Sequence, residues 1–306
     1  MAAKPIVVVG SSNTDMIIKL DRIPRPGETI LGGQFVTAAG GKGANQAVAA
    51  ARAGGQVAFI ARVGRDMLGD QAVAGFVRDG INVDYVHRDK SSPSGVALIF
   101  VANDGENSIA VASGANGKLS PADVKKAKTL IAAAGVLVMQ LETPLETVQA
   151  AAELAARAGV RVILNPAPAQ PLPDELLRCI SILTPNETEA ELLTGIRVDS
   201  QATAIKAAEA IRARGVPTVV VTLGAKGALL VDGDQRCLVP GFKVEAVDTT
   251  AAGDVFNGAL AVALAEGKGM VEAVRFASAA AAISVTCMGA QPSAPTRRKI
   301  AAMLKR

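Results

Sequence analysis

The sequence has few of the residues that build metal and redox sites. Its 306 residues include one histidine, no tryptophan and three cysteines. Cys179, Cys237 and Cys287 are odd in number, far apart and without Cys-x-x-Cys spacing, which argues against a disulfide framework and for a reducing compartment. The single histidine, His87, excludes a histidine-based metal cluster, and we expect it to be a strand-end residue without a catalytic role.

Net charge is also small. The 32 Lys and Arg residues exceed the 28 Asp and Glu residues by four, and their even spread does not point to nucleic acid. One basic cluster lies near the C-terminus and consists of Arg297, Arg298, Lys299, Lys305 and Arg306. Because no aromatic residues are interleaved, this cluster predicts the solvated face of a C-terminal helix, and we expect no nucleic-acid partner.

Long apolar runs are missing as well. The first apolar run breaks at Gly10 and is too short for a signal-peptide core. The uncharged stretch 276–296 is interrupted by Gly289, Pro292 and Pro295, which indicates a buried helix and loop rather than a membrane span. We therefore expect a cytoplasmic protein without a membrane partner.

The chain does contain a regular alternation of short β-branched runs and alanine-rich stretches. We expect strands at 6–9, 57–63, 136–139, 160–164 and 219–222, and helices near 43–53, 67–79, 145–158 and 201–214. This rhythm predicts a three-layer α/β/α fold with a mostly parallel central sheet, built from residues 1–14, 41–94 and 113–306.

Two stretches, 15–40 and 95–112, break the rhythm. They alternate polar and apolar residues, carry turn signals at 24–27 and 103–105, and lack a helix pattern. We expect them to form a small antiparallel β lid beside the main domain. An exposed lid sheet has free edges and an apolar face, so we also expect a homodimer that pairs through the lid.

The segment from Asp248 to Asp254 places two carboxylates around a turn of small residues before a helical run. Backbone amides in such a turn, together with the positive end of the helix, can bind an anion beside Asp254. The alternative is an ordinary helix start, in which Asp248 is a turn residue and Asp254 a favourable first-turn acid. This segment alone does not decide between them.

Polar loops at the other strand ends favour the anion site. Ligands of an open α/β sheet bind beyond the carboxyl ends of its strands, and polar groups follow several of the expected strands there. They occur at 11–15, 40–45, 140–142, 165–168, 186–189 and 222–227. The chain has neither a Walker A sequence nor a GxGxxG after the first strand, so a nucleotide would have to be held in another way.

Two motifs resemble the signatures of the ribokinase-like carbohydrate kinases, in the same order and separation. They are Gly40-Gly-Lys-Gly-Ala-Asn-Gln-Ala-Val-Ala-Ala-Ala-Arg-Ala-Gly54 and Asp248-Thr-Thr-Ala-Ala-Gly-Asp-Val-Phe-Asn-Gly258. The segments 140–142, 165–169 and 289–293 resemble the ribose-directed branch more than the fructose-, nucleoside- or ketodeoxygluconate-directed branches. The resemblance covers about 10–293. It departs at Ala251, where the family usually has glycine; we expect the small side chain to preserve the amide nest.

The resemblance implies ATP-dependent phosphorylation of D-ribose at O5. Asp254 would be the general base, and the amides of Ala251, Ala252 and Gly253 would form an anion hole for the transferred phosphoryl group. The sugar would be bound by a sugar-side group consisting of Asn13, Asp15, Gly41, Lys42, Gly43, Asn45, Glu142 and Asp254. Taken singly, Asn13 and Asp15 also read as a polar turn, and Glu142 as a surface acid near a helix start; their joint position favours binding.

The resemblance also implies the nucleotide and cation sites. ATP would contact Asn186, Thr222, Leu223, Gly224, Ala225, Lys226, Gly227 and Gly253. Glu189, in an Asn-x-x-Glu motif, would hold Mg²⁺ largely through water, although the same residues read as a helix start. K⁺ would be bound by Asp248, Thr250, Ser284, Cys287, Gly289 and Ser293, mostly through backbone carbonyls.

Two other functions stay open at this stage. One is another sugar or nucleoside kinase of the same family, acting on deoxyribose, ketodeoxygluconate, fructose or adenosine. A nucleoside kinase should stack the base on aromatic side chains, and none stands beside Asn13, Lys42 or Glu142 in the sequence. The other is a non-catalytic sugar or nucleotide sensor on the same scaffold, against which the intact set of polar residues argues.

Overall fold

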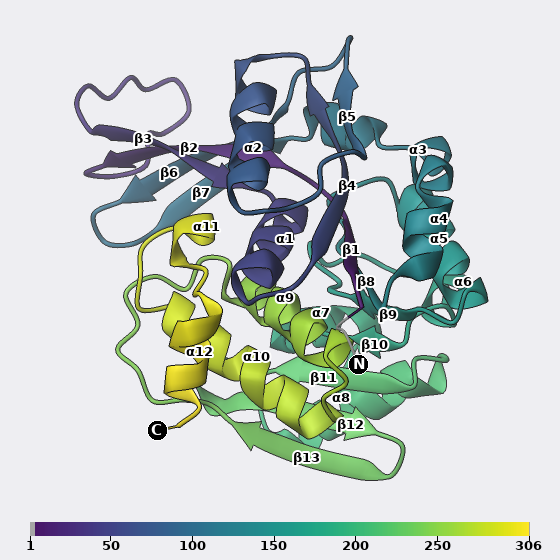
Figure 1. The fold of residues 1–306 in the computed structure, drawn as a ribbon. Helices are drawn as coiled ribbons and strands as arrows, with labels where there is room; N and C mark the ends of the chain where they lie inside the picture. The colour runs from purple at the N-terminus through teal and green to yellow at the C-terminus, as the bar shows by residue number, and fades with distance from the viewer. Residues whose placement is uncertain (1–3, 306) are drawn as a thin grey trace.

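A nine-stranded sheet runs through the part of the chain that the computed structural model describes, residues 4–305 (Figure 1). In spatial order the strands are β13 (Gln235–Pro240), β12 (Gly227–Asp232), β11 (Thr218–Thr222), β10 (Ile182–Leu183), β9 (Arg161–Leu164), β8 (Val136–Met139), β1 (Ile6–Val9), β4 (Val57–Gly64) and β5 (Val86–Asp89). All neighbours from β11 to β5 pair in parallel, whereas β12 and β13 add an antiparallel edge.

Helices cover both faces of this sheet, because its strands are apolar on both sides. In β1, Ile6 and Val8 belong to one hydrophobic cluster, while Val7 and Val9 belong to the other. The first cluster is covered by α1 (Lys42–Arg52), α2 (Met67–Arg78), α9 (Ala252–Ala265), α10 (Met270–Ser284) and α12 (Arg297–Met303), with the short α11 (Ala290–Ser293) beside α1. The second is covered by α3 (Pro121–Lys126), α4 (Lys128–Ala133), α5 (Leu145–Arg157), α6 (Asp174–Leu177), α7 (Glu187–Thr194) and α8 (Gln201–Ala213). The expected three-layer fold is confirmed.

A second, four-stranded sheet projects from this body beside α1 and α2 (Figure 1). Its order is β3 (Gln34–Gly40), β2 (Asn13–Leu20), β6 (Gly95–Ala102) and β7 (Asn107–Ala112). The β3–β2 and β6–β7 pairs are antiparallel, but β2 and β6 pair in parallel, because the chain passes through the main body between them. We call this sheet the lid.

The C-terminal basic cluster is only partly a solvated face. Arg298, Lys299 and Lys305 are exposed, and Arg306 lies outside the described residues. Arg297 instead pairs with Glu266 and stacks its guanidinium 4.8 Å from the ring centre of Phe276. Between residues 4 and 305 no helix has both the length and the apolar character needed to cross a bilayer.

Candidate active site

The carboxylate of Asp254 lies at the centre of the candidate site. It is 5% exposed and stands in the first turn of α9, which packs against α1. Asn45 Nδ2 donates to its Oδ2 at 3.0 Å, and Gln46 Nε2 donates to its Oδ1 at 2.9 Å. Burial raises the pKa of Asp254, whereas the charge of Lys42 and these two hydrogen bonds lower it. The carboxylate is therefore held in one orientation with a basicity above that of a solvated aspartate.

The backbone before Asp254 is shaped to receive an anion. Ala251 caps α9 with φ 59° and ψ 13°, the one left-handed non-glycine residue among those described. The amides of Gly253 and Asp254 have no backbone acceptor within the described chain, because they belong to the first helical turn. The helix dipole adds positive partial charge at this end. Within the predicted nest, the Ala252 amide donates to the carbonyl of Thr249 at 3.3 Å, and Ala251 adopts a conformation that glycine adopts more readily.

The predicted sugar residues of β2 and α1 meet at the same end of the main sheet. Lys42 is the first residue of α1, and its amide donates to Glu142 Oε2 at 2.9 Å. Ser11 Oγ donates to the same carboxylate. A side chain at Gly41 would place its Cβ 2.6 Å from the amide nitrogen of Asn13, so this close approach requires glycine.

Asp15 shares the electrostatic field of the site. Its pKa is raised to about 6, first by burial and then by the negative charges of Glu142 and Asp254. Carboxyl groups from β2, from the loop after β8 and from α9 therefore interact electrostatically. Such a concentration of negative charge is unfavourable for the empty protein, and it suits the recognition of a polyhydroxy ligand whose hydroxyls donate hydrogen bonds.

Two residues of this region were not predicted from the sequence. Asn116 is 1% exposed and lies in the 3-10 helix Gly114–Lys118; its Nδ2 donates to Asn13 Oδ1 at 2.7 Å. Its Oδ1 accepts from the amide of Ser12 at 2.8 Å. Gln46 is the other residue, and the only sequence signal for it is a polar side chain next to Asn45 in an otherwise alanine-rich helix.

Seven of the eight predicted nucleotide residues lie at the end of β11, and the eighth, Gly253, lies in the first turn of α9. Asn186 forms an isolated parallel bridge with Thr222, and the Thr222 amide donates to the carbonyl of Pro185 at 2.9 Å. The turn 223–227 joins β11 to the antiparallel strand β12 through a short 3-10 helix, so it is also a hairpin turn. Gly224, Ala225 and Lys226 are exposed, which leaves their backbone accessible.

Asn186 and Glu189 form a capping box at the start of α7. Asn186 Oδ1 accepts from the Glu189 amide at 2.8 Å, and Glu189 Oε2 accepts from the Asn186 amide at 2.9 Å. Burial raises the pKa of Glu189, against the lowering effects of the Asn186 hydrogen bond and Lys42. The described residues contain no cluster of three or more His, Cys, Asp or Glu that could hold a metal ion. Helix capping is therefore one role of this pair, whatever else it binds.

The loops that carry the predicted K⁺ ligands are tied together. The amides of Val247 and Asp248 donate to the carbonyl of Val285, and the Gly289 amide donates to Asp248 Oδ2 at 2.7 Å. Asp248 Oδ1 accepts from the Thr250 amide at 2.9 Å. Burial works to raise the pKa of Asp248, but these hydrogen bonds outweigh it and the pKa is lowered. Ser284 and Ser293 are buried, whereas Cys287 is exposed.

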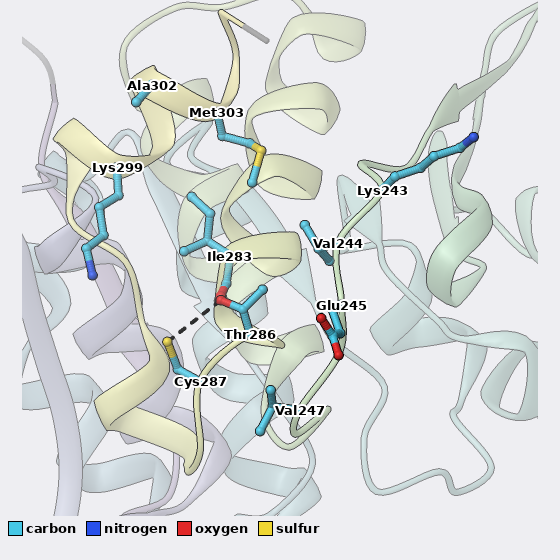
Figure 2. Close-up of a pocket in the computed structure, with 10 residues that line it drawn as sticks. All are labelled: Lys243, Val244, Glu245, Val247, Ile283, Thr286, Cys287, Lys299, Ala302 and Met303. Carbon is cyan, nitrogen blue, oxygen red and sulfur yellow. Dashed lines mark hydrogen bonds between the residues drawn. The ribbon is translucent and has the colours of Figure 1, made fainter.

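A cleft of about 660 Å³ opens beside these loops. Figure 2 shows it between the end of α10, α12 and the segment 243–247, with Cys287 and Thr286 on its wall. Of the predicted site residues it includes Cys287 and none from the sugar side.

His87 takes part in a separate group of charges. It lies within β5, and its Nε2 is 3.6 Å from Asp123 Oδ1. Arg62 bridges Asp123 and Asp89 at 2.6 and 2.7 Å. Burial, the largest effect, lowers the pKa of His87. Its contacts are thus with the ion pairs of β4 and α3.

Comparisons with known proteins agree with the geometry. Residues 3–297 match the model of the pfkB family carbohydrate kinases. A ribokinase of Haemophilus influenzae is 50% identical over 296 residues, covering 97% of both chains, and a deoxyribokinase of Salmonella typhi is 41% identical over 292 residues, covering 95% of both. The solved structure of Arabidopsis thaliana ribokinase complexed with ribose and ATP has a TM-score of 0.93 and 38% identity, with 100% of both chains covered.

Proposed function

The chain belongs to the pfkB family of carbohydrate kinases, and we propose that it is the member that transfers the terminal phosphoryl group of ATP to O5 of D-ribose. The products are D-ribose 5-phosphate and ADP. The observation that carries the proposal is the buried carboxylate of Asp254 directly after the free amides of a helix N-terminus. A base and an anion site then lie within one helical turn, as phosphoryl transfer to a hydroxyl requires.

In this mechanism the sugar-side group binds the hydroxyls of ribose and directs O5 toward Asp254. Asp254 accepts the proton of the 5-hydroxyl as that oxygen attacks the γ-phosphorus, and the bond to ADP breaks. The amides of Ala251, Gly253 and Asp254 stabilise the charge on the phosphoryl oxygens, and Lys42 adds a fixed positive charge that already lowers the pKa of Asp254. The lid excludes water, which is the competing acceptor.

ATP is proposed to bind along Asn186 and the turn 222–227, where accessible backbone follows β11. Mg²⁺ fits the oxygens of Glu189 and Asn186 through water, since it is a hard cation that keeps most of its hydration shell. When bound it neutralises charge on the phosphates. K⁺ fits the oxygen ligands offered by the loops around Asp248 and Gly289, which are joined by hydrogen bonds, and Asp248 supplies the one carboxylate among the predicted K⁺ ligands.

Deoxyribose is the main alternative acceptor, because a deoxyribokinase is 41% identical over nearly the whole chain. A non-catalytic sensor is disfavoured by the pair of amides that orient Asp254, since binding alone needs no oriented base. A coupled assay of ADP release over ribose, deoxyribose, fructose, ketodeoxygluconate and adenosine distinguishes these functions. The proposal requires ribose to give the highest kcat/KM, and absence of sugar-stimulated turnover would reject it.

We further propose that the enzyme is cytoplasmic and dimerises through the lid. Six large apolar side chains of the lid region are at least 48% exposed: Leu31, Phe35, Val36, Leu98, Ile109 and Val111. The strand register of the lid places Val36, Ile109 and Val111 on one face and Phe35 and Leu98 on the other, and exposed apolar side chains of this kind are typical of a protein interface. Sedimentation should give a dimer that Leu98→Arg dissociates. Leu192→Arg, on α7 and equally exposed in the native protein, is the matched control and should leave the dimer intact.

A further inference from the structure

We propose that Gln46 is a positioning residue for the base: its amide anchors Oδ1 of Asp254 and leaves Oδ2 to take the proton of the sugar hydroxyl. The inference rests on the proposed role of Asp254. Gln46 is fully buried in α1, and its Nε2 lies 2.9 Å from Asp254 Oδ1 and 3.1 Å from Asn165 Oδ1. The two N–H bonds of the amide are therefore both used.

The orientation of Gln46 is fixed by a chain of buried amides. An ionised carboxylate only accepts hydrogen bonds, so the NH₂ group of Gln46 must face Asp254. Its Oε1 then faces Gln140, whose Nε2 donates to it at 2.6 Å. Asn165, which accepts from Gln46, uses its own Nδ2 toward the carbonyl of Thr184 at 3.4 Å. Turning any of these amides would put donor against donor or acceptor against acceptor, so the network has one polarity.

The two oxygens of Asp254 have different surroundings. Oδ1 faces Gln46, which is 0% exposed, and the interior amides behind it. Oδ2 is held by Asn45, which is 7% exposed and belongs to the sugar-side group. Asn45 Oδ1 is buried and has no hydrogen-bond partner among residues 4–305, so this side of the carboxylate retains an acceptor for a ligand hydroxyl. The geometry assigns Oδ2 as the working oxygen.

Packing alone does not explain a glutamine at this position. Its neighbours Ala44, Ala47 and Ala50 are buried, and α1 packs closely on α9, where Gly258 approaches the carbonyl of Gln46. An unbranched apolar side chain of similar volume would fill the space without burying an amide. The amide is needed because burial favours the protonated form of Asp254, and a donor to the carboxylate opposes that effect.

Gln46→Met tests the inference because it keeps the volume and removes the donor. We expect the acid limb of the kcat profile to move up by about one pH unit, so that kcat on that limb falls by up to about 10-fold, with KM values for ribose and ATP changed less than about threefold. Activity should partly recover as the pH rises. Gln149→Met on α5, whose native amide donates a hydrogen bond to Glu153, is the matched control with unchanged kinetics.

An unchanged pH profile, with kcat falling only in parallel with thermal stability, would overturn the inference. If Gln46→Met does not fold, Gln140→Met replaces it, because it removes the donor to Gln46 Oε1 and so weakens the positioning of the Gln46 amide without touching Asp254. A smaller upward shift of the same limb is then expected, and no shift rejects the proposal. Asp254→Asn distinguishes failure of the base assignment from failure of the role proposed for Gln46. If Asp254→Asn stays active, Asp254 is not the base. If Asp254→Asn is inactive and the pH profile of Gln46→Met is unshifted, only the role of Gln46 is rejected.

Discussion

Asn116 holds the side chain of Asn13 from a position 103 residues further along the chain. Its Nδ2 donates to Asn13 Oδ1 at 2.7 Å, while its Oδ1 accepts from Ser12 N at 2.8 Å. Asn13 is therefore turned so that its own NH₂ group is available as a donor to the sugar. Asn116 lies in the 3-10 helix that follows β7, so its side chain links the segment after the lid to the proposed sugar site.

Asn116→Asp should weaken ribose binding, because a carboxylate cannot donate to Asn13 Oδ1. We expect KM for ribose to rise about 10-fold, because one buried hydrogen bond is lost, while KM for ATP stays unchanged. Steady-state kinetics with each substrate varied measures the split. Asn103→Ala, at an exposed lid turn, controls for general effects on the lid. An equal rise in both KM values would contradict the assignment.

Ala251→Gly should stabilise the protein. An alanine in the left-handed region costs roughly 1 kcal/mol that glycine does not, and Ala251 has φ 59°. We expect the free energy of unfolding to rise by about 0.5 to 1 kcal/mol, with kcat within twofold of the parent. Ala252→Gly, one residue later inside α9, should instead lower stability by a similar amount. Urea denaturation measures both, and a loss of stability in both variants would contradict the strain at Ala251.

Asp15 should make ribose binding sensitive to mild acid. Its pKa in the folded protein is about 6, above the ordinary 3.8, so the carboxylate is lost as the pH falls through about 6. We expect the affinity for ribose, measured by calorimetry, to fall from pH 7 to pH 5. Asp15→Asn should bind ribose weakly at both values, and an Asp15→Asn protein with the parent's pH dependence would assign the effect to another group.

The same shift predicts a stability gain in Asp15→Asn. A raised carboxyl pKa means that the ionised form of Asp15 destabilises the folded protein. This destabilisation is absent below about pH 4, grows between the ordinary pKa of 3.8 and the folded-state pKa of about 6, and is complete above about 6. Removing the charge should therefore raise the free energy of unfolding at pH 8 by about 1 to 3 kcal/mol, discounted because the side chain is partly exposed. No gain is expected below pH 4.

The main sheet could be predicted from local sequence because its strands are short, apolar on both faces and separated by alanine-rich helices. The stretches around Ile6, Val57 and Val136 are such strands, and each pairs in the parallel register that this pattern favours. The parallel pairing of β2 with β6 was not expected. It depends on which strands meet after the chain has left the lid and returned, and hydrophobic periodicity contains no information on that.

The candidate site likewise contains residues that the sequence predicts and residues that it does not. Asp254, Asn45 and Lys42 were predicted because their motifs resemble those of a family, and in the structure Asn45 donates to Asp254 while the charge of Lys42 acts on it. Gln46 and Asn116 were missed because their partners lie 208 and 103 residues away, and a buried amide looks the same in sequence as an exposed one. The left-handed backbone of Ala251 was also not determined locally, since alanine alone favours a helical conformation there.

Activity should depend on K⁺ through Asp248. The lowered pKa of this residue keeps it ionised at neutral pH, so it can contribute a full negative charge to a cation site. Replacing K⁺ by Cs⁺ should lower kcat, and Asp248→Asn should raise the K⁺ concentration for half-maximal activity by about 10-fold, the loss of about 1.4 kcal/mol of binding. Glu245→Gln, at a nearby exposed acid, is the control. Equal activity in K⁺ and Cs⁺ would remove the cation site from the mechanism.

Asp254→Asn tests the base itself. Loss of a general base should lower kcat by about 10²-fold or more, while the Kd values for ribose and ATP change little. Both oxygens of Asp254 accept from amides, so an asparagine must turn its NH₂ group toward the donor of either Asn45 or Gln46. A stability loss of about 1 to 2 kcal/mol is therefore expected as well, and binding must be measured directly by calorimetry on folded protein. Single-turnover mixing with ATP and ribose then isolates the chemical step: turnover near the parent rate, with both ligands bound, means that another group removes the proton.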